Sequence, residues 1–187
     1  MAIEAKVCTA LTGGGADALD FIDGSTLNNG DIAYTKVNGK FYYHRCNTAG
    51  GLTEDSPIVI VPDTNPGSIN WELAGSNQMI TIAKTSDFTV TAAYLQAGVM
   101  ITNTGAAGAV NLTLPAGAAD YSLECFVDAA QYLRCTANGS ETFRYGTGTS
   151  AAGGYIRANT IGTHWKINWL GGEWVIKLYA LTLKYDE

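Results

Sequence analysis

Charged residues are scarce in this sequence: they make up 15% of its 187 residues, against about 25% in ordinary globular proteins. The basic residues form no cluster and the net charge is −6, so we expect no nucleic-acid partner. No apolar run approaches the roughly 20 residues that a membrane-spanning helix needs, which predicts no membrane partner. The first eight residues lack the basic and apolar regions of a signal peptide, so we expect synthesis in a cytoplasm.

Catalytic signatures are absent too. There is no G-x-S-x-G elbow, no P-loop and no G-x-G-x-x-G after an expected strand. No C-x-x-C pair suggests a zinc ribbon or a thioredoxin-type motif. The two histidines, His44 and His164, fall in different expected domains. The sequence therefore predicts no enzyme, no catalytic residue and no cofactor, and only a cleft with perturbed carboxylates would favour catalysis.

Two groups of residues have spacings that resemble metal sites. His44 and Cys46 are two positions apart on an expected strand and would point to the same side, but further ligands are missing. Asp17, Asp20 and Asp23 recur every three residues, which differs from the alternating ligands of a calcium loop. Aspartates beside glycines more often accept backbone N–H bonds in turns. We therefore predict no metal site.

The four cysteines occupy positions 8, 46, 125 and 135. In a reducing compartment they are typical of small buried hydrophobic side chains. Cys125 and Cys135 lie across an expected hairpin within residues 122–137, where they would face each other. The sequence alone leaves open whether these two form a disulfide.

What the sequence has in quantity is glycine, 22 residues, together with Thr, Val, Ile and Tyr. Expected strands recur every 8–12 residues with turn signals between them, and no stretch supports a helix longer than two turns. These patterns predict an all-β protein with two small antiparallel β domains. A segment without periodicity, AGSNQ, places the boundary so that the domains are 1–75 and 76–187. The second domain should resemble a sandwich or jelly roll.

Two hairpins are specified in detail by their turns. Asn38-Gly39 is typical of a type I′ turn and pairs Val37 with Lys40. Gly171-Gly172 predicts a hairpin that pairs Trp169 with Trp174 and places most of the tryptophans on one apolar face. Because side chains alternate along a strand, we interpret these tryptophans as core rather than as a platform for a ligand.

Two segments resemble modules of bacteriophage and prophage virion proteins. In residues 15–73, a G-D-x-A strand, a short hairpin, an E-x-S-P-x-V-I-x-P-D strand and an N-P-G-x-x-x-W ending follow one another, as in tail-associated proteins. The second segment begins with ITNTGAAGAVNLTLPAG and ends with W-x-x-x-W-x-x-G-x-W-V. Together the two similarities cover most of residues 10–178. The chain differs from many fibre proteins in lacking a long repetitive shaft.

The resemblance implies a structural virion component: a tail fibre, a baseplate or tail-tip adaptor, or a capsid decoration protein. Such a protein would be made in the bacterial cytoplasm, located in the virion, and would bind other virion proteins. It would form a homo-oligomer, with a trimer favoured, since small glycine-rich β modules gain stability from packing between subunits. Residues 1–75 would dock to the particle and residues 76–187 would be displayed.

An alternative is a carbohydrate-binding module that recognises a host surface glycan. Tyrosines on loops or polar faces stack on sugar C–H surfaces, and loops on a rigid β scaffold often carry binding residues. The candidate contacts are Tyr132, Tyr145 and Tyr155. Half-buried structural tyrosines are the competing interpretation.

Overall fold

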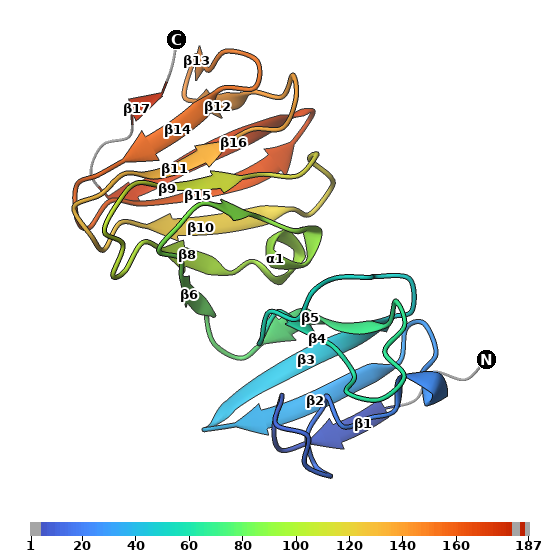
Figure 1. Cartoon of the computed structure of the whole chain (residues 1–187). Coiled ribbons are helices and arrows are strands. Elements are labelled where there is room, and N and C mark those ends of the chain that lie inside the picture. Colours follow the sequence, from blue (N-terminus) through green and yellow to red (C-terminus); the bar gives the residue numbers. More distant parts are fainter. Residues whose placement is uncertain (1–4, 181–183, 186–187) are drawn as a thin grey trace. The chain divides into compact units, whose positions relative to one another are not determined.

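Figure 1 shows the computed structural model of the chain, in which residues 5–180 and 184–185 are described. Contacts divide the chain into two compact units, residues 1–79 (unit 1) and 80–187 (unit 2). The boundary expected after residue 75 falls inside strand β5 (Asn70–Ser76). The strand extends that far because Gly75 and Ser76 still pair with Tyr43 and Tyr42 on the neighbouring strand.

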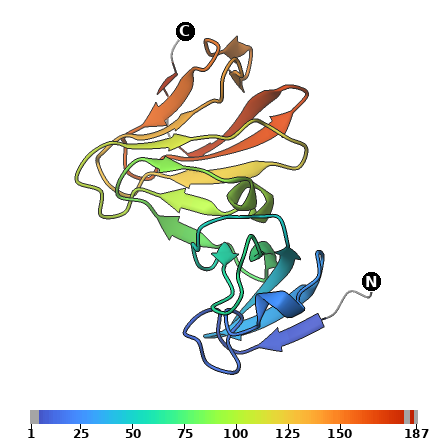
Figure 2. The same cartoon turned by 45° about the vertical axis from the view of Figure 1, so that its right-hand side comes forward.

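Unit 1 is built on one sheet with the strand order β1-β2-β3-β5-β4 (Figures 1 and 2). Besides β5, its elements are β1 (Ala5–Cys8), a 3₁₀ turn η1 (Gly24–Thr26), β2 (Ile32–Val37), β3 (Lys40–Asn47) and β4 (Val59–Ile60). The predicted β2–β3 hairpin is confirmed, with Val37 opposite Lys40. Asn38 and Gly39 have φ of 50° and 78°, the left-handed values that a type I′ turn requires.

One face of this sheet packs mainly against the loop that connects β1 to β2. The cluster at its centre is fully apolar and includes Trp71, Leu19, Ile60, Ala33 and Cys46. Asp20 is also buried, and its carboxylate accepts the backbone N–H groups of the glycine loop at residues 13 and 14. The interpretation of the aspartates as turn-stabilising residues is thus confirmed at this position.

Among the described residues, the strands of unit 2 form two sheets. One has the order β13-β12-β16-β15-β10-β8-β6 and the other the order β17-β14-β11-β9-β7. The first comprises β6 (Thr81–Ala83), β8 (Met100–Thr102), β10 (Ser122–Phe126), β12 (Phe143–Tyr145), β13 (Gly148–Thr149), β15 (His164–Leu170) and β16 (Glu173–Ala180). The second comprises β7 (Phe88–Thr89), β9 (Val110–Thr113), β11 (Leu133–Thr136), β14 (Tyr155–Ala158) and β17 (Lys184–Tyr185). The all-β prediction is confirmed.

The prediction that both domains are antiparallel is wrong. β6, β8 and β10 are parallel neighbours in one sheet, and β7, β9 and β11 are parallel neighbours in the other. In unit 1, β1 and β2 are parallel as well. From β6 to β11 the chain passes from one sheet to the other after each strand, so every second strand runs in the same direction. Successive passes therefore stack like the coils of a solenoid before the chain returns through antiparallel strands β14 and β15.

The expected hairpin around Cys125 and Cys135 does not form, because β10 and β11 belong to different sheets. The two cysteines nevertheless face each other, with their Sγ atoms 3.5 Å apart. All four cysteines are buried free thiols, as small hydrophobic residues would be. Burial raises the pKa of the Cys125 thiol well above its usual value, and the hydrogen bond with Cys135 adds to the effect.

The turn between β10 and β11 is held by one buried side chain, Asn103. Its Oδ1 atom accepts the backbone N–H groups of Asp128 and Ala129 at 2.8 and 3.0 Å. Its Nδ2 atom donates to the carbonyl oxygens of Ala129 and Gln131 at 3.1 and 2.9 Å. These four bonds support the bend that carries the chain from the first sheet to the second.

The predicted tryptophan hairpin is confirmed in its register, with Trp169 opposite Trp174. Trp165 and Trp174 are completely buried, whereas Trp169 is partly exposed. One short helix, α1 (Ala92–Ala97), follows β7 and stays within the two-turn limit that the sequence predicts for helices. It buries Ala93, Tyr94 and Leu95. Among the residues that the structure describes, no helix has the length and apolar character to cross a membrane.

Candidate functional site

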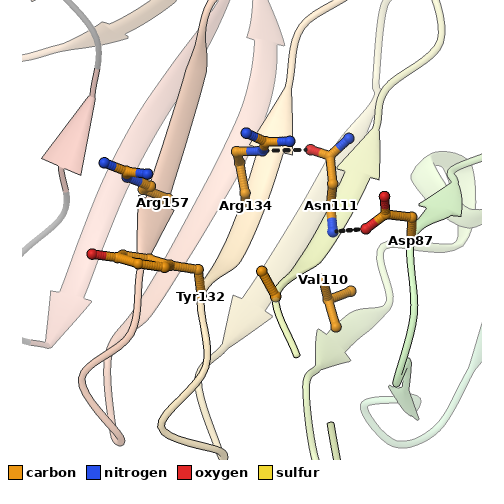
Figure 3. A pocket seen from close by; sticks show the side chains of 7 residues that line it. Asp87, Val110, Asn111, Tyr132, Arg134 and Arg157 are labelled. Atoms are coloured by element: carbon orange, nitrogen blue, oxygen red, sulfur yellow. Dashed lines mark hydrogen bonds between the residues drawn. The ribbon is translucent and has the colours of Figure 1, made fainter. Parts of the chain in front are cut away.

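A polar face on the five-stranded sheet of unit 2 gathers two arginines and two tyrosines. Figure 3 shows the two arginines with one of the tyrosines, Tyr132. We call it the Arg–Tyr face; it consists of Asn111, Tyr132, Arg134, Tyr155 and Arg157. Asn111 lies on β9, Arg134 lies on β11, and Tyr155 and Arg157 lie on β14, whereas Tyr132 lies two residues before Arg134 and just outside β11.

Strand register explains why these side chains meet. Arg134 on β11 lies directly opposite Arg157 on β14 and is also paired with Asn111 on β9. The residues next to these arginines in the sequence, such as Cys135 and Ile156, are completely buried. Because side chains alternate along each strand, one side of the sheet supplies core residues and the other supplies this polar row.

Asn111 holds Arg134 in place from the neighbouring strand β9. Its Oδ1 atom accepts hydrogen bonds from Nε of Arg134 at 2.9 Å and from the Thr136 hydroxyl at 2.7 Å. Its backbone N–H donates to the carboxylate of Asp87 at 2.8 Å. Figure 3 shows the resulting order across the sheet, from Asp87 through Asn111 and Arg134 to Arg157.

The two arginines stack against tyrosine rings. The guanidinium carbon of Arg157 lies 4.6 Å from the centre of the Tyr132 ring and 5.3 Å from that of Tyr155. Arg134 lies 5.3 Å from the Tyr155 ring. Such cation–π contacts contribute about 0.5–1 kcal/mol each at exposed sites. They orient the guanidinium groups while leaving most of their N–H donors free to bind another molecule.

Beside this row lies a cavity of about 210 Å³. It is lined by Asp87, Ala109, Val110, Asn111, Tyr132, Arg134 and Arg157. Within the described part of the chain, Nε of Arg157 is buried and has no hydrogen-bond partner. The cavity thus combines cationic donors, a carboxylate acceptor and an aromatic wall, which suits a small polar ligand.

The structure places the three predicted glycan-contact residues differently. Tyr132 and Tyr155 come together around Arg157, whereas Tyr145 lies on β12 in the other sheet of unit 2 and is 40% exposed. Arg134, Arg157 and their support by Asn111 were not identified from the sequence. A signal was present: the tripeptides YLR (132–134) and YIR (155–157) repeat the same tyrosine-to-arginine spacing, which puts both side chains on one face of a strand.

His44 and Cys46, whose spacing resembles a metal site, both lie buried among structural residues of unit 1. His44 is completely buried, and its Nε2 atom lies 2.8 Å from the carbonyl oxygen of Pro57, to which it donates. Burial lowers the pKa of His44 to about 4, so the ring is neutral at physiological pH. In the described residues, no three His, Cys, Asp or Glu side chains converge as metal ligands would.

A second hollow in unit 2 lies beside Trp169 at the end of the tryptophan hairpin. The ring of Trp169 meets the edge of Trp174 at 5.3 Å between centroids, and it also covers Gly117, where a Cβ atom would be 2.0 Å from Cε3 of the ring. These contacts give Trp169 a packing role, so the Arg–Tyr face is the stronger candidate site.

Searches of protein-family models, curated proteins and solved structures found no match for this chain.

Proposed function

We propose that this protein is a non-enzymatic structural component of a bacteriophage particle, of the tail-fibre, tail-associated or capsid-decoration type, with a role in host attachment. The proposal starts from the virion-module motifs of the sequence. The observation that carries it furthest is how the buried polar side chains are used. Buried Asp20 holds the glycine loop and buried Asn103 holds the β10–β11 turn, while the partly buried Glu141 bonds to the backbone of Gly117 and to Trp174. Their hydrogen bonds go to structural elements.

In this proposal the chain is made in the bacterial cytoplasm and functions in the virion as a homo-oligomer, with a trimer favoured. Unit 1, which contains the motifs of tail-associated proteins, docks to other virion proteins, and unit 2 is displayed. The large side chains that unit 1 exposes on neighbouring strands support a docking role: Val7 is 83% exposed and Tyr34, opposite it in register, is 49% exposed. Apolar groups left in water on one sheet face are characteristic of contact surfaces.

The finer assignment of unit 2 to the sandwich or jelly-roll type is part of the same proposal. It is supported by two facing sheets whose inner side chains, such as Cys125 and Cys135, meet in an apolar interior. The parallel ladders are a departure from that type.

Imaging of intact particles, with antibody fragments against unit 2, tests the proposal. We expect the chain at symmetric positions on the tail or capsid, and a molar mass in solution that is a multiple of the single-chain mass. A chain absent from purified particles, or monomeric at all micromolar concentrations tested by light scattering, would contradict the proposal.

Recognition of a host glycan is a second candidate function. It is favoured by the Arg–Tyr face, where Tyr132 lines a cavity of unit 2 and Tyr155 contacts Arg157, which lines the same cavity. In an attachment protein the two functions are compatible, since the displayed unit would carry the binding site.

A further inference from the structure

We infer that the Arg–Tyr face binds a saccharide that carries a carboxylate group, with Arg157 and Arg134 holding the carboxylate and Tyr132 contacting the sugar ring. The inference adds a ligand class to the proposed attachment role. It rests on that role for the statement that the host surface offers such a sugar. Three features of the site support it: the charge of the row, the geometry of the donors, and the size and polarity of the cavity.

The first feature is the charge of the two arginines. Arg134 and Arg157 are directly opposite each other on neighbouring strands, an arrangement in which like charges repel and destabilise a sheet. Among the described residues, neither guanidinium forms an ion pair with a carboxylate, although the whole chain carries a net charge of −6. An anionic ligand would remove this local repulsion, so the row is electrostatically incomplete without one.

The second feature is the direction of the N–H donors. The guanidinium of arginine presents N–H groups in a planar fork that matches the two oxygens of a carboxylate. Arg134 already uses its Nε atom to bond Asn111, which fixes the direction of its remaining donors. Arg157 lies between the rings of Tyr132 and Tyr155, and its buried Nε atom still lacks a partner. Both guanidiniums are thus oriented before any ligand arrives.

The third feature is the cavity. Its volume of about 210 Å³ is below the roughly 300–1,000 Å³ of pockets for larger small molecules. It suits a unit of the size of one sugar ring. Its far end carries the carboxylate of Asp87 beside Asn111, and such a carboxylate accepts hydrogen bonds from sugar hydroxyl groups. A nucleic acid is disfavoured, because its successive phosphates would meet Asp87 and an acidic protein. A sugar acid presents one anionic group to the arginines and hydroxyl groups to the acidic end.

The binding test uses the full chain and matched ligands. Oligomers of four galacturonic acid residues and oligomers of N-acetylneuraminic acid are titrated by calorimetry, and methyl-esterified galacturonic oligomers serve as neutral counterparts. We expect at least one acidic oligomer to bind and the esterified oligomers to bind at least tenfold more weakly. We also expect Arg157→Gln and Arg134→Gln each to weaken binding at least tenfold, because a charge-assisted hydrogen bond is lost.

Two control variants lie in unit 2 outside the site. Arg144→Gln removes a guanidinium that pairs with Glu173 on the other sheet, and Tyr145→Ala removes an exposed tyrosine of the same sheet. Both should bind the acidic oligomer as the unchanged protein does. The unfolding temperature of Arg157→Gln should stay close to that of the unchanged protein, since relief of the repulsion offsets the lost cation–π contacts. A variant that loses binding because it is misfolded would instead unfold well below that temperature.

Several results would overturn the inference. Equal binding of acidic and esterified oligomers would make the face a neutral glycan site, and equally strong binding of inorganic sulfate or phosphate would make it a general anion site. Absence of binding by both acidic oligomers at millimolar concentration would also exclude it. Because these measurements use the isolated chain, they are independent of its place in a particle. A chain missing from the virion would refute the proposed function and leave the sugar site standing.

Discussion

Gly117 shows how a single hydrogen atom in place of a side chain can determine local packing. Its Cα faces the ring of Trp169, and its backbone N–H donates to Glu141, whose other oxygen accepts the indole N–H of Trp174 at 2.9 Å. One glycine and one glutamate thereby connect two of the three tryptophans of the terminal hairpin, Trp169 and Trp174, to the segment that follows β9. Nothing in the sequence near residue 117 predicts this contact, because the partners of Gly117 lie more than 20 positions away in the chain.

We predict that Gly117→Ala lowers the free energy of unfolding of unit 2 by about 1–3 kcal/mol, the usual cost of overpacking. The added methyl group would require Trp169 to move away from the backbone. Gly108→Ala is the matched control, because a Cβ atom there meets nothing within 4 Å. The two variants can be compared by urea denaturation followed by tryptophan fluorescence. Equal stabilities would show that Trp169 has room to move.

His44 makes the stability of unit 1 dependent on pH. Its pKa is about 4 in the folded protein and about 6.5 in an unfolded chain. Between these values the unfolded chain binds a proton that the folded protein does not, so stability is complete above pH 6.5 and falls as the pH decreases toward 4. The loss should approach about 3 kcal/mol at the lower end of this window.

The measurement is the pH dependence of unfolding in the unchanged protein and in His44→Gln. Glutamine cannot titrate, and its amide retains a donor for the Pro57 carbonyl, so the variant should lose less stability between pH 6.5 and 4. Carboxylates that titrate in the same range contribute equally to both proteins. Parallel curves would show that His44 does not control this acid sensitivity.

At the scale of elements, the turn between β10 and β11 determines how unit 2 is wound. In the sequence, the segment from Cys125 to Cys135 has the appearance of a hairpin, because two short alternating strands flank six residues with no strand pattern. The structure sends the second strand to the opposite sheet instead. Asn103, far away in sequence, satisfies the backbone groups of the bend, which local patterns cannot reveal.

We predict that Asn103→Ala destabilises unit 2 by about 2–4 kcal/mol, since backbone donors and acceptors of the turn lose their partners in a partly buried place. Gln131→Ala is the control: it changes a side chain of the same turn and leaves the bonded backbone oxygen of residue 131 in place. Thermal unfolding followed by circular dichroism compares the two. Similar unfolding temperatures would mean that water replaces the Asn103 bonds without loss.

At the scale of the whole molecule, the two units have separate cores and should respond separately to these changes. Acid should weaken the protection of amides in residues 5–76 through His44, and Gly117→Ala should weaken protection in residues 81–180. Hydrogen exchange followed by mass spectrometry resolves the two regions. Loss of protection across both units after either change would show that the units unfold together.

The sequence alone determined the all-β class, both tight hairpins with their registers, and the buried state of Trp165 and Trp174. These features follow from alternation and turn chemistry, which act between residues close along the chain. It located Tyr132 and Tyr155 as candidates, but tertiary structure decided that they meet Arg134 and Arg157 and that Tyr145 does not join them. Tertiary structure also decided that strands from successive passes lie parallel. Such pairings join residues 19 or more positions apart, where local periodicity carries no information and burial of the common core selects the partner.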